Sequence, residues 1–188
     1  ARAFPSEHAS NPPSLCIDGG VSTFTWSTAS NNFTKPSFLG LLFPGAVTLD
    51  GIRLWKDKNG GSGANTKDLV IQYTVAAMPV IGGGVWQNVS GLSNGFSGTE
   101  LMVAGSVNSD GTVLGDVHDS VNDGHGWATL RFDRVQATGV RIAFSVPDNS
   151  ANHYKVHEFR AFQSDLLLDC NGNGTLDVCD VSSGTSGD

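Results

Sequence analysis

Apolar and polar residues alternate with a period of two along much of the chain. This pattern is clear in the segments 68–75 (DLVIQYTV), 127–132 (WATLRF) and 139–146 (GVRIAFSV). Such a period is typical of β-strands with one buried face. The side chains predicted to point inward are Leu69, Ile71, Tyr73, Val75, Ala128, Leu130, Phe132, Val140, Ile142, Phe144 and Val146, whereas Arg141 and Ser145 are expected to point outward.

Further strands are predicted at 37–43, 47–55, 85–90, 99–107 and 153–159, and helical periodicity is scarce. Within 47–55 the apolar phase slips between Leu49 and Ile52, which indicates a β-bulge near Asp50 and Gly51. Many short strands joined by Gly-rich turns favour two packed antiparallel sheets. The sequence therefore predicts an all-β sandwich, a jelly roll, over residues 1–163.

Charge is concentrated at the end of the chain. Of the net charge of −7, residues 164–188 supply five Asp and no base, which leaves −2 for the body. A nucleic-acid partner would require a basic face, so this balance argues against one. No apolar run reaches the ~18 residues of a membrane span. At 188 residues the chain has room for one domain and a short tail.

The tail contains the twelve-residue stretch DCNGNGTLDVCD, residues 169–180, in which oxygen-bearing side chains recur at the spacing of a calcium loop. Its predicted ligands are Asp169, Asn171, Asn173, Asp177 and Asp180, with Thr175 donating its backbone carbonyl. Gly174 stands where such a loop turns sharply. The alternative is an Asx-rich flexible tail, since Asn, Asp and Gly also favour turns. The stretch resembles the calcium repeats of dockerins and thrombospondin type 3 modules.

The three cysteines, Cys16, Cys170 and Cys179, match no zinc-binding pattern. A disulfide between Cys170 and Cys179 would clip the ends of the calcium loop, and a disulfide from Cys16 to either of them is the alternative. A calcium loop with disulfide-forming cysteines indicates an oxidising, calcium-rich exterior. We therefore expect a secreted or cell-surface protein.

Several segments resemble, in the right order, the discoidin or coagulation factor type C domains, which are galactose-binding-like sandwiches. They are IDGGVSTFTW (17–26), LDGIRLW (49–55), KDLVIQYTV (67–75), VWQNV (85–89), LRFDRVQATGVRIAFS (130–145) and HYKVHEF (153–159). The resemblance spans residues 9–162. It implies a ligand-binding domain, because the sandwich domains of this family rarely catalyse a reaction.

Glu158 is the first candidate metal ligand of the body. Val156 and Glu158 share a face before the apolar phase passes to Phe159 and Ala161, so the pattern places a carboxylate near the core at a strand irregularity. An unpaired charge there would be costly, and a bound cation would offset it. The resemblance implies a structural calcium ion held by Asp18, Glu158 and Thr23, with backbone carbonyls near Gly20. The alternative is a simple turn at Asp18 and a satisfied edge residue at Glu158.

Two stretches carry residue types that could serve catalysis. GLSNG (91–95) fits the nucleophile elbow, but that elbow needs a following helix, so Ser93 is predicted to be a loop serine. The segment 116–127 gathers four groups able to bind metal or transfer protons, without the spacing of a known metalloenzyme motif. These are His118, Asp119, Asp123 and His125. We expect no enzyme activity.

The resemblance implies a ligand site in loops at one end of the sandwich, where relatives hold galactose-type sugars. The candidate residues are Asn31, Lys56, Asp57, Asn152 and His153. Each is otherwise an ordinary solvated loop residue, and Lys56 stands near the place where many relatives have Arg. The sequence thus predicts a non-catalytic, calcium-containing glycan-binding module of a larger secreted protein. The alternative is a structural or adhesive calcium module that binds no sugar.

Overall fold

The computed structural model describes residues 2–4, 26–27, 37–56, 64–65, 67–95, 103, 105–117, 126–144 and 153–164. These residues form strands and connecting turns without a helix, in the order β1 (Arg2–Phe4), β2 (Trp26–Ser27), β3 (Ser37–Lys56), β4 (Ala64–Asn65), β5 (Lys67–Thr74), β6 (Gln87–Asn88), β7 (Ser93–Asn94), β8 (Ser106–Val107), β9 (Thr112–Asp116), β10 (Gly126–Phe144), β11 (His153–Val156) and β12 (Glu158–Phe162). The described part of the chain thus contains no helix that could cross a membrane.

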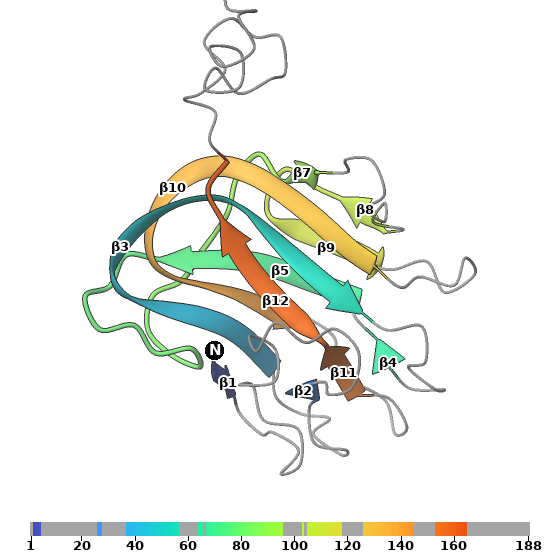
Figure 1. Ribbon diagram of the computed structural model, residues 1–188, viewed down its shortest axis with the longest axis horizontal. Coiled ribbons are helices and arrows are strands. Elements are labelled where there is room, and N and C mark those ends of the chain that lie inside the picture. The colour runs from blue at the N-terminus through green and yellow to red at the C-terminus, as the bar shows by residue number, and fades with distance from the viewer. Residues whose placement is uncertain are drawn as a thin grey trace, which may run out of the picture.

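Two long strands, β3 and β10, pair antiparallel along nearly their whole length and bend together (Figure 1). The second half of β3 and the first half of β10 lie in a layer with β12 and β7. Their other halves lie in a layer with β1, β5, β9 and β8. The bent pair therefore joins the two layers of an antiparallel β-sandwich, which confirms the predicted fold class.

The core lies between these layers and is formed by the side chains that the alternation predicted to point inward. Ala128, Leu130, Ile142 and Phe144 are at most 1% exposed, and Phe132 is 6% exposed. Ile52, Leu54 and Phe159 meet them from β3 and β12. Val75, in contrast, is 60% exposed because β5 ends one residue before it, so its predicted inward position is wrong.

The predicted irregularity at Asp50 is present. Gly51 pairs with Arg131 and Leu49 pairs with Val135, so that one residue of β3 stands opposite three residues of β10. The extra residues lie in β10 and sharpen the bend of the paired strands. Gly51 leaves room here for the ring of Phe162, with which a Cβ atom would collide.

Arg141 departs from its predicted exposure. It does point away from the core, but it is only 8% exposed, because the loop that follows β5 covers it. Its guanidinium carbon lies 4.0 Å from the ring centre of Phe38 and 4.4 Å from that of Trp86, and it donates hydrogen bonds to Gln72 and to the carbonyl of Ile81. Burial lowers the pKa of Arg141 to about 10, so it stays charged at neutral pH.

Several predicted strands differ in extent from the observed ones: 37–43 and 47–55 are parts of the single strand β3, and 127–132 and most of 139–146 fall on the single strand β10. Within 85–90 and 99–107, the described residues form only β6 and β8, whereas β9 was not predicted. The segment 153–159 divides at His157, whose backbone N–H donates to the carbonyl of Trp55 at 2.9 Å. This break is the strand irregularity predicted before Glu158.

Candidate functional site

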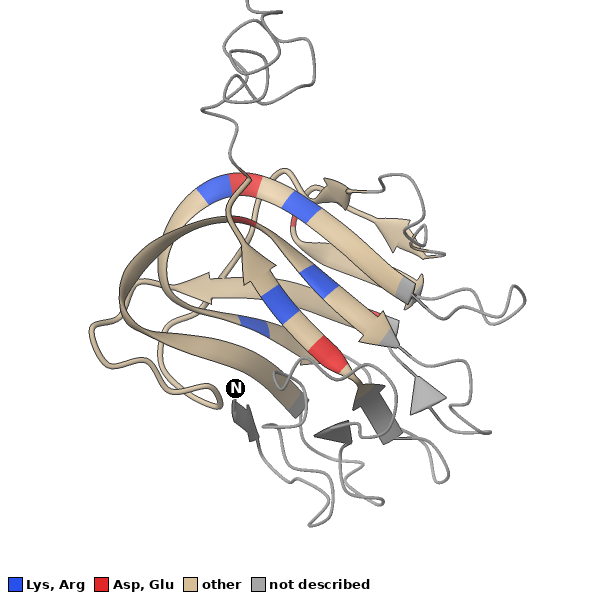
Figure 2. Ribbon diagram, viewed as in Figure 1, with Lys and Arg blue, Asp and Glu red and all other residues tan. Residues whose placement is uncertain are grey.

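The outer face of the layer that contains β12 carries polar and aromatic side chains in three rows. The rows follow from the pairing of β12 with β3 and of β3 with β10. They are Glu158, Trp55 and Trp127; Arg160, Arg53 and Thr129; and Phe162, Gly51 and Arg131. Figure 2 shows the resulting blue bands at neighbouring places on β12, β3 and β10. Alternation therefore gathers three arginines over a core of apolar residues.

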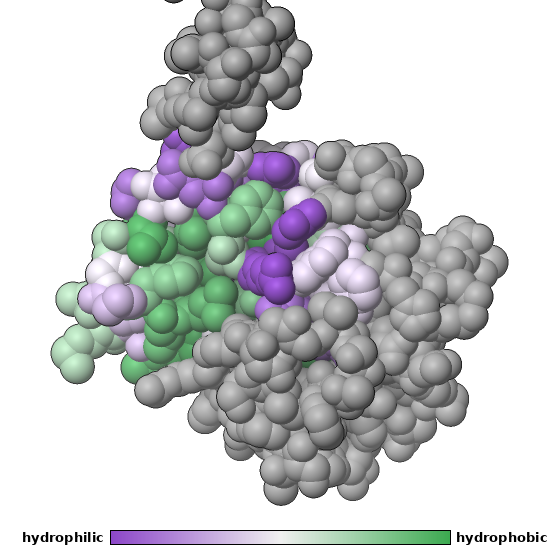
Figure 3. All heavy atoms as spheres, in the orientation of Figure 1, coloured by the Kyte–Doolittle hydropathy of each residue, from purple (hydrophilic) through white to green (hydrophobic). Residues whose placement is uncertain are grey.

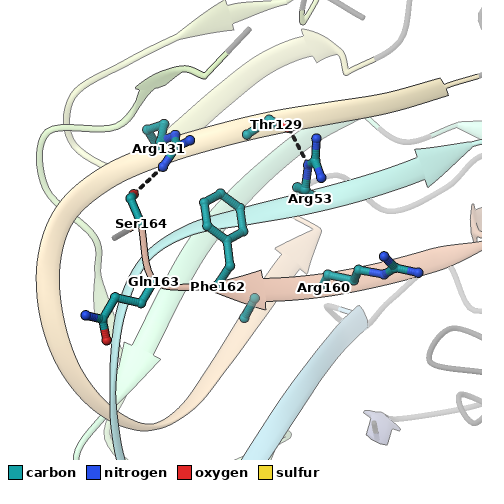
Figure 4. A pocket seen from close by; sticks show the side chains of 8 residues that line it. Arg53, Thr129, Arg131, Arg160, Phe162, Gln163 and Ser164 are labelled. Carbon is teal, nitrogen blue, oxygen red and sulfur yellow. Dashed lines mark hydrogen bonds between the residues drawn. The ribbon is translucent and has the colours of Figure 1, made fainter. Parts of the chain in front are cut away.

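A cavity of about 420 Å³ opens among these side chains (Figure 4). Its lining residues are Arg53, Thr129, Arg131, Arg160, Ala161, Phe162, Gln163 and Ser164. A second cavity, of about 470 Å³, adjoins it and shares Arg131 and Ser164. In the space-filling view, hydrophilic residues are exposed on this side of the molecule, beside a hydrophobic area (Figure 3). We call the first cavity the arginine cavity.

Aromatic rings hold the arginines of this cavity in place. The guanidinium carbon of Arg160 lies 4.7 Å from the ring centre of Trp127, and that of Arg53 lies 5.5 Å from the same ring. Arg131 lies 4.8 Å from the ring centre of Phe162. Trp127 in turn meets Trp55 edge to face at 5.4 Å. Cation–π contacts of this kind fix the planes of the guanidinium groups.

Hydrogen bonds also hold the guanidinium groups of Arg53 and Arg131. Arg53 donates from Nε to the hydroxyl of Thr129 at 3.0 Å, and Arg131 donates to the hydroxyl of Ser164. Burial, followed by the positive charges of Arg160 and Arg131, lowers the pKa of Arg53. Arg160 and Arg131 are therefore each close enough to repel Arg53.

Asp50 anchors the end of the cavity at Ser164. Its Oδ1 atom accepts hydrogen bonds from the backbone N–H and the hydroxyl of Ser164, both at 2.6 Å, and its Oδ2 atom pairs with Arg134 at 3.2 Å. Burial alone would raise the pKa of Asp50, but the hydrogen bonds from Ser164 and Arg134 outweigh it and lower that pKa. The ionised carboxylate thus fixes the point at which the chain leaves β12.

Glu158 is the one predicted calcium ligand that lies among the described residues, and its predicted burial is confirmed at 3% exposed. Its Oε1 atom accepts a hydrogen bond from Arg160 at 3.1 Å. Its Oε2 atom is buried, and no described residue donates to it. A buried carboxylate oxygen that receives no hydrogen bond from the described residues fits a cation ligand, because leaving such an atom unpaired is costly.

The other predicted calcium ligands lie outside the described residues. They are Asp18, Gly20 and Thr23 of the body and Asp169, Asn171, Asn173, Thr175, Asp177 and Asp180 of the tail. Cys16, Cys170 and Cys179 lie outside them as well. Within the described ranges, three or more His, Cys, Asp or Glu residues do not gather anywhere in a metal-binding cluster.

Two of the predicted sugar ligands, Lys56 and His153, are placed by their backbone. Lys56 ends β3, and His153 opens β11, where it pairs with Ala64 of β4. β11 also contacts β3, so the structure brings these strand ends to the same region of the fold (Figure 1). Asn31, Asp57 and Asn152 lie outside the described residues.

The candidate catalytic residues are only partly described. Ser93 is exposed in the two-residue strand β7, opposite Arg131 of β10. The polar residues His118, Asp119, Asp123 and His125 lie outside the described ranges. The arginine cavity itself was missed in the sequence. Its only signal was an arginine between apolar residues at three places in or directly after predicted strands, as at Arg53 between Ile52 and Leu54.

No protein-family model matches the chain, and no curated protein matches it. The fold does match solved structures. One is chitosan-binding module 1 of a chitosanase/glucanase from Paenibacillus sp. IK-5, with a TM-score of 0.56 and 18% identity over 86% of this chain and 92% of that one. Another is the CBM32-3 module of a family 31 glycoside hydrolase from Clostridium perfringens. Its TM-score is 0.57, with 15% identity over 87% of this chain and 89% of that one.

A third similar structure is a Clostridium perfringens CBM32 module in complex with GalNAc-β-1,3-galactose, with a TM-score of 0.55 and 14% identity over 86% of this chain and 94% of that one. At these identities the likeness is one of fold. The chain has the antiparallel β-sandwich of the CBM32, galactose-binding-like modules, and it matches almost their full length.

Proposed function

We propose that the chain is a non-catalytic carbohydrate-binding module of a larger secreted protein and that it contains structural calcium. The observation that carries this proposal is the fold shared with modules that are named for sugar binding or were solved with bound sugar. Fold alone hosts many functions, so the proposal also needs a site.

The proposed sugar site lies in the loops near the end of β3 and the start of β11. Lys56 and His153 come from these strand ends, and Asn31, Asp57 and Asn152 complete the set of polar side chains. The ligand is a neutral, galactose-like glycan. Its affinity is modest, because hydroxyl groups exchange water partners for protein partners and much of the sugar stays hydrated.

Calcium has two proposed places. In the body, Asp18, Glu158 and Thr23 would hold it with carbonyls near Gly20, and the buried Oε2 atom of Glu158 supports this site. In the tail, the loop 169–180 would hold a second ion. At the body site, calcium would supply the positive charge that the buried carboxylate lacks at Oε2.

The proposal is tested by calorimetric titration of galactose, N-acetylgalactosamine and their oligosaccharides, with calcium and with chelator. Lys56→Ala and His153→Ala should weaken binding while the protein stays folded, and Ser93→Ala, which changes an exposed serine of β7, is the matched control. Release of sugar from labelled glycans would contradict a non-catalytic module. Absence of binding across a broad neutral panel would favour the structural or adhesive alternative.

A further inference from the structure

The arginine cavity lies away from the proposed sugar site. β12 runs antiparallel to β3, so that Glu158 pairs with Trp55, next to Lys56, whereas Phe162 pairs with Gly51. The cavity extends from the Arg160–Arg53 row past Phe162 to Ser164, which is the far end of this strand pair. Its lining residues and the candidate sugar ligands have no member in common. A ligand bound here would occupy a second, independent site.

Positive charge exceeds negative charge in this cavity. Three arginines line it: Arg53, Arg131 and Arg160. Within the described part of the chain, Glu158 forms an ion pair with one of them, Arg160. Asp50 lies in the adjoining cavity and already pairs with Arg134. None of the described carboxylates forms an ion pair with Arg131, whose partners there are Ser164 and the ring of Phe162. The cavity is thus a local cationic site on a chain with a net charge of −7.

The guanidinium groups are oriented before any ligand arrives. Figure 4 shows Phe162 between Arg131 on one side and Arg53 on the other, with Arg160 on the same strand as Phe162, β12, and extending away from Arg131. The rings of Phe162 and Trp127 hold the planes of these cations. Arg160 uses Nε for Glu158, and Arg131 uses one terminal nitrogen for Ser164. Since a guanidinium carries five N–H donors in a fixed fork, both retain donors suited to a carboxylate or sulfate.

The remaining lining suits the body of a sugar. Gln163 is exposed and offers an amide, which both donates to and accepts from hydroxyl groups. Phe162 and Ala161 provide the apolar surface that the C–H faces of a pyranose ring can contact. A volume of about 420 Å³ falls in the range of small-ligand pockets. A cationic polysaccharide such as chitosan would be repelled by the three arginines.

We propose that the arginine cavity binds an acidic saccharide, a sugar that carries a carboxylate or a sulfate. Arg131 and Arg160 each bind an acidic group of the saccharide, Arg53 adds positive charge between them, and Gln163 contacts neighbouring hydroxyls. The acidic tail that begins directly after Ser164 is the competing occupant, because it carries five Asp and no base.

The test uses the full chain and matched pairs of oligosaccharides in calorimetric titrations. Tetragalacturonate is compared with its methyl ester, and a chondroitin sulfate tetrasaccharide with its desulfated, carboxyl-reduced form. We expect the acidic member of at least one pair to bind and its neutral counterpart to fail. The pair that responds identifies carboxylate or sulfate as the acidic group. Binding should weaken strongly between about 50 mM and 500 mM salt, because the charges are partly exposed.

Variants localise the site. Arg131→Gln and Arg160→Gln should each weaken binding about tenfold or more, since each removes hydrogen bonds to a charged group. Arg160→Lys should recover only part of the loss, because it keeps the charge and loses the fork. Lys67→Gln is the matched control, because it removes one positive charge from the first residue of β5, a strand of the other layer whose described residues line neither cavity. Its affinity should stay within about twofold of the original.

Three outcomes would overturn the proposal. Equal binding of acidic and neutral members, or no binding of either acidic member, would exclude an acid-selective site. Equal weakening by Lys67→Gln and Arg131→Gln would show general charge attraction instead of a site. Acidic sugars that bind only after Asp165→Asn and Asp188→Asn would identify the tail as the occupant; neither residue belongs to the predicted calcium loop.

Discussion

Asp50→Ala should detach the end of β12 and destabilise the fold. The carboxylate is 5% exposed and accepts two hydrogen bonds of 2.6 Å from Ser164. Hydrogen bonds to a charged group contribute ~1.5–3 kcal/mol each, and the half-exposed pair with Arg134 adds at most ~1 kcal/mol. Water can replace part of these contacts at Ser164, which is half-buried. We therefore expect a loss of about 3 kcal/mol, or roughly 6–12 °C in Tm for a chain of this size.

The loss should depend on pH, because the pKa of Asp50 is lowered in the folded protein. Such a carboxylate stabilises the fold fully above its unfolded pKa of about 3.9, and the stabilisation disappears as the pH falls through the lower folded value. In urea unfolding at pH 7, the free energies of unfolding of the original chain and of Asp50→Ala should therefore differ by the full amount. At pH 3 the difference between these free energies should be smaller.

The matched control for this prediction is Asp133→Ala. Asp133 lies on the bend of β10, is exposed, and accepts one hydrogen bond from Ser90 at 2.8 Å. Its loss should cost less than about 1 kcal/mol. Equal destabilisation by the two variants, or a difference at Asp50 that does not shrink at pH 3, would refute the assigned role of Asp50.

Three further predictions follow from single contacts. Gly51→Ala should cost about 1–3 kcal/mol in urea unfolding, because its Cβ would displace the ring of Phe162; an unchanged midpoint would contradict this packing. Glu158→Gln should lower Tm more in calcium than in chelator, since a ligand at a hundred times its Kd stabilises the native state by about 2.7 kcal/mol, and equal losses in both buffers would count against the body calcium site. Chelation should increase proteolysis after about residue 165 if the loop 169–180 binds calcium, whereas identical digestion would argue against that loop.

The sequence predicted the fold class because alternation is a local property. In each core strand, alternating apolar residues such as Leu130 and Ile142 identify the buried face. The phase slip at Asp50 marks the place where β3 and β10 bend. Glu158 could be predicted as buried for the same reason, since its neighbours Val156 and Phe159 define opposite faces around an irregularity.

Other features depend on contacts that are distant in sequence. Arg141 is correctly placed on an outward face, but its burial results from a loop that lies about 60 residues earlier in the chain. The arginine cavity likewise requires the register that sets Arg160 opposite Arg53 and Phe162 opposite Gly51. Alternation predicts which way each side chain points, but it does not specify which strands become neighbours.

The central claim, non-catalytic sugar binding at the loop end, is tested most directly by amide NMR of the isotope-labelled chain during titration with the disaccharide GalNAc-β-1,3-galactose in calcium. We predict saturable shifts centred on Lys56 and His153, little change at core residues such as Leu130, and an unaltered sugar at the end of the titration. Unchanged spectra at millimolar sugar, shifts centred elsewhere on the fold, or conversion of a glycan to products would contradict it.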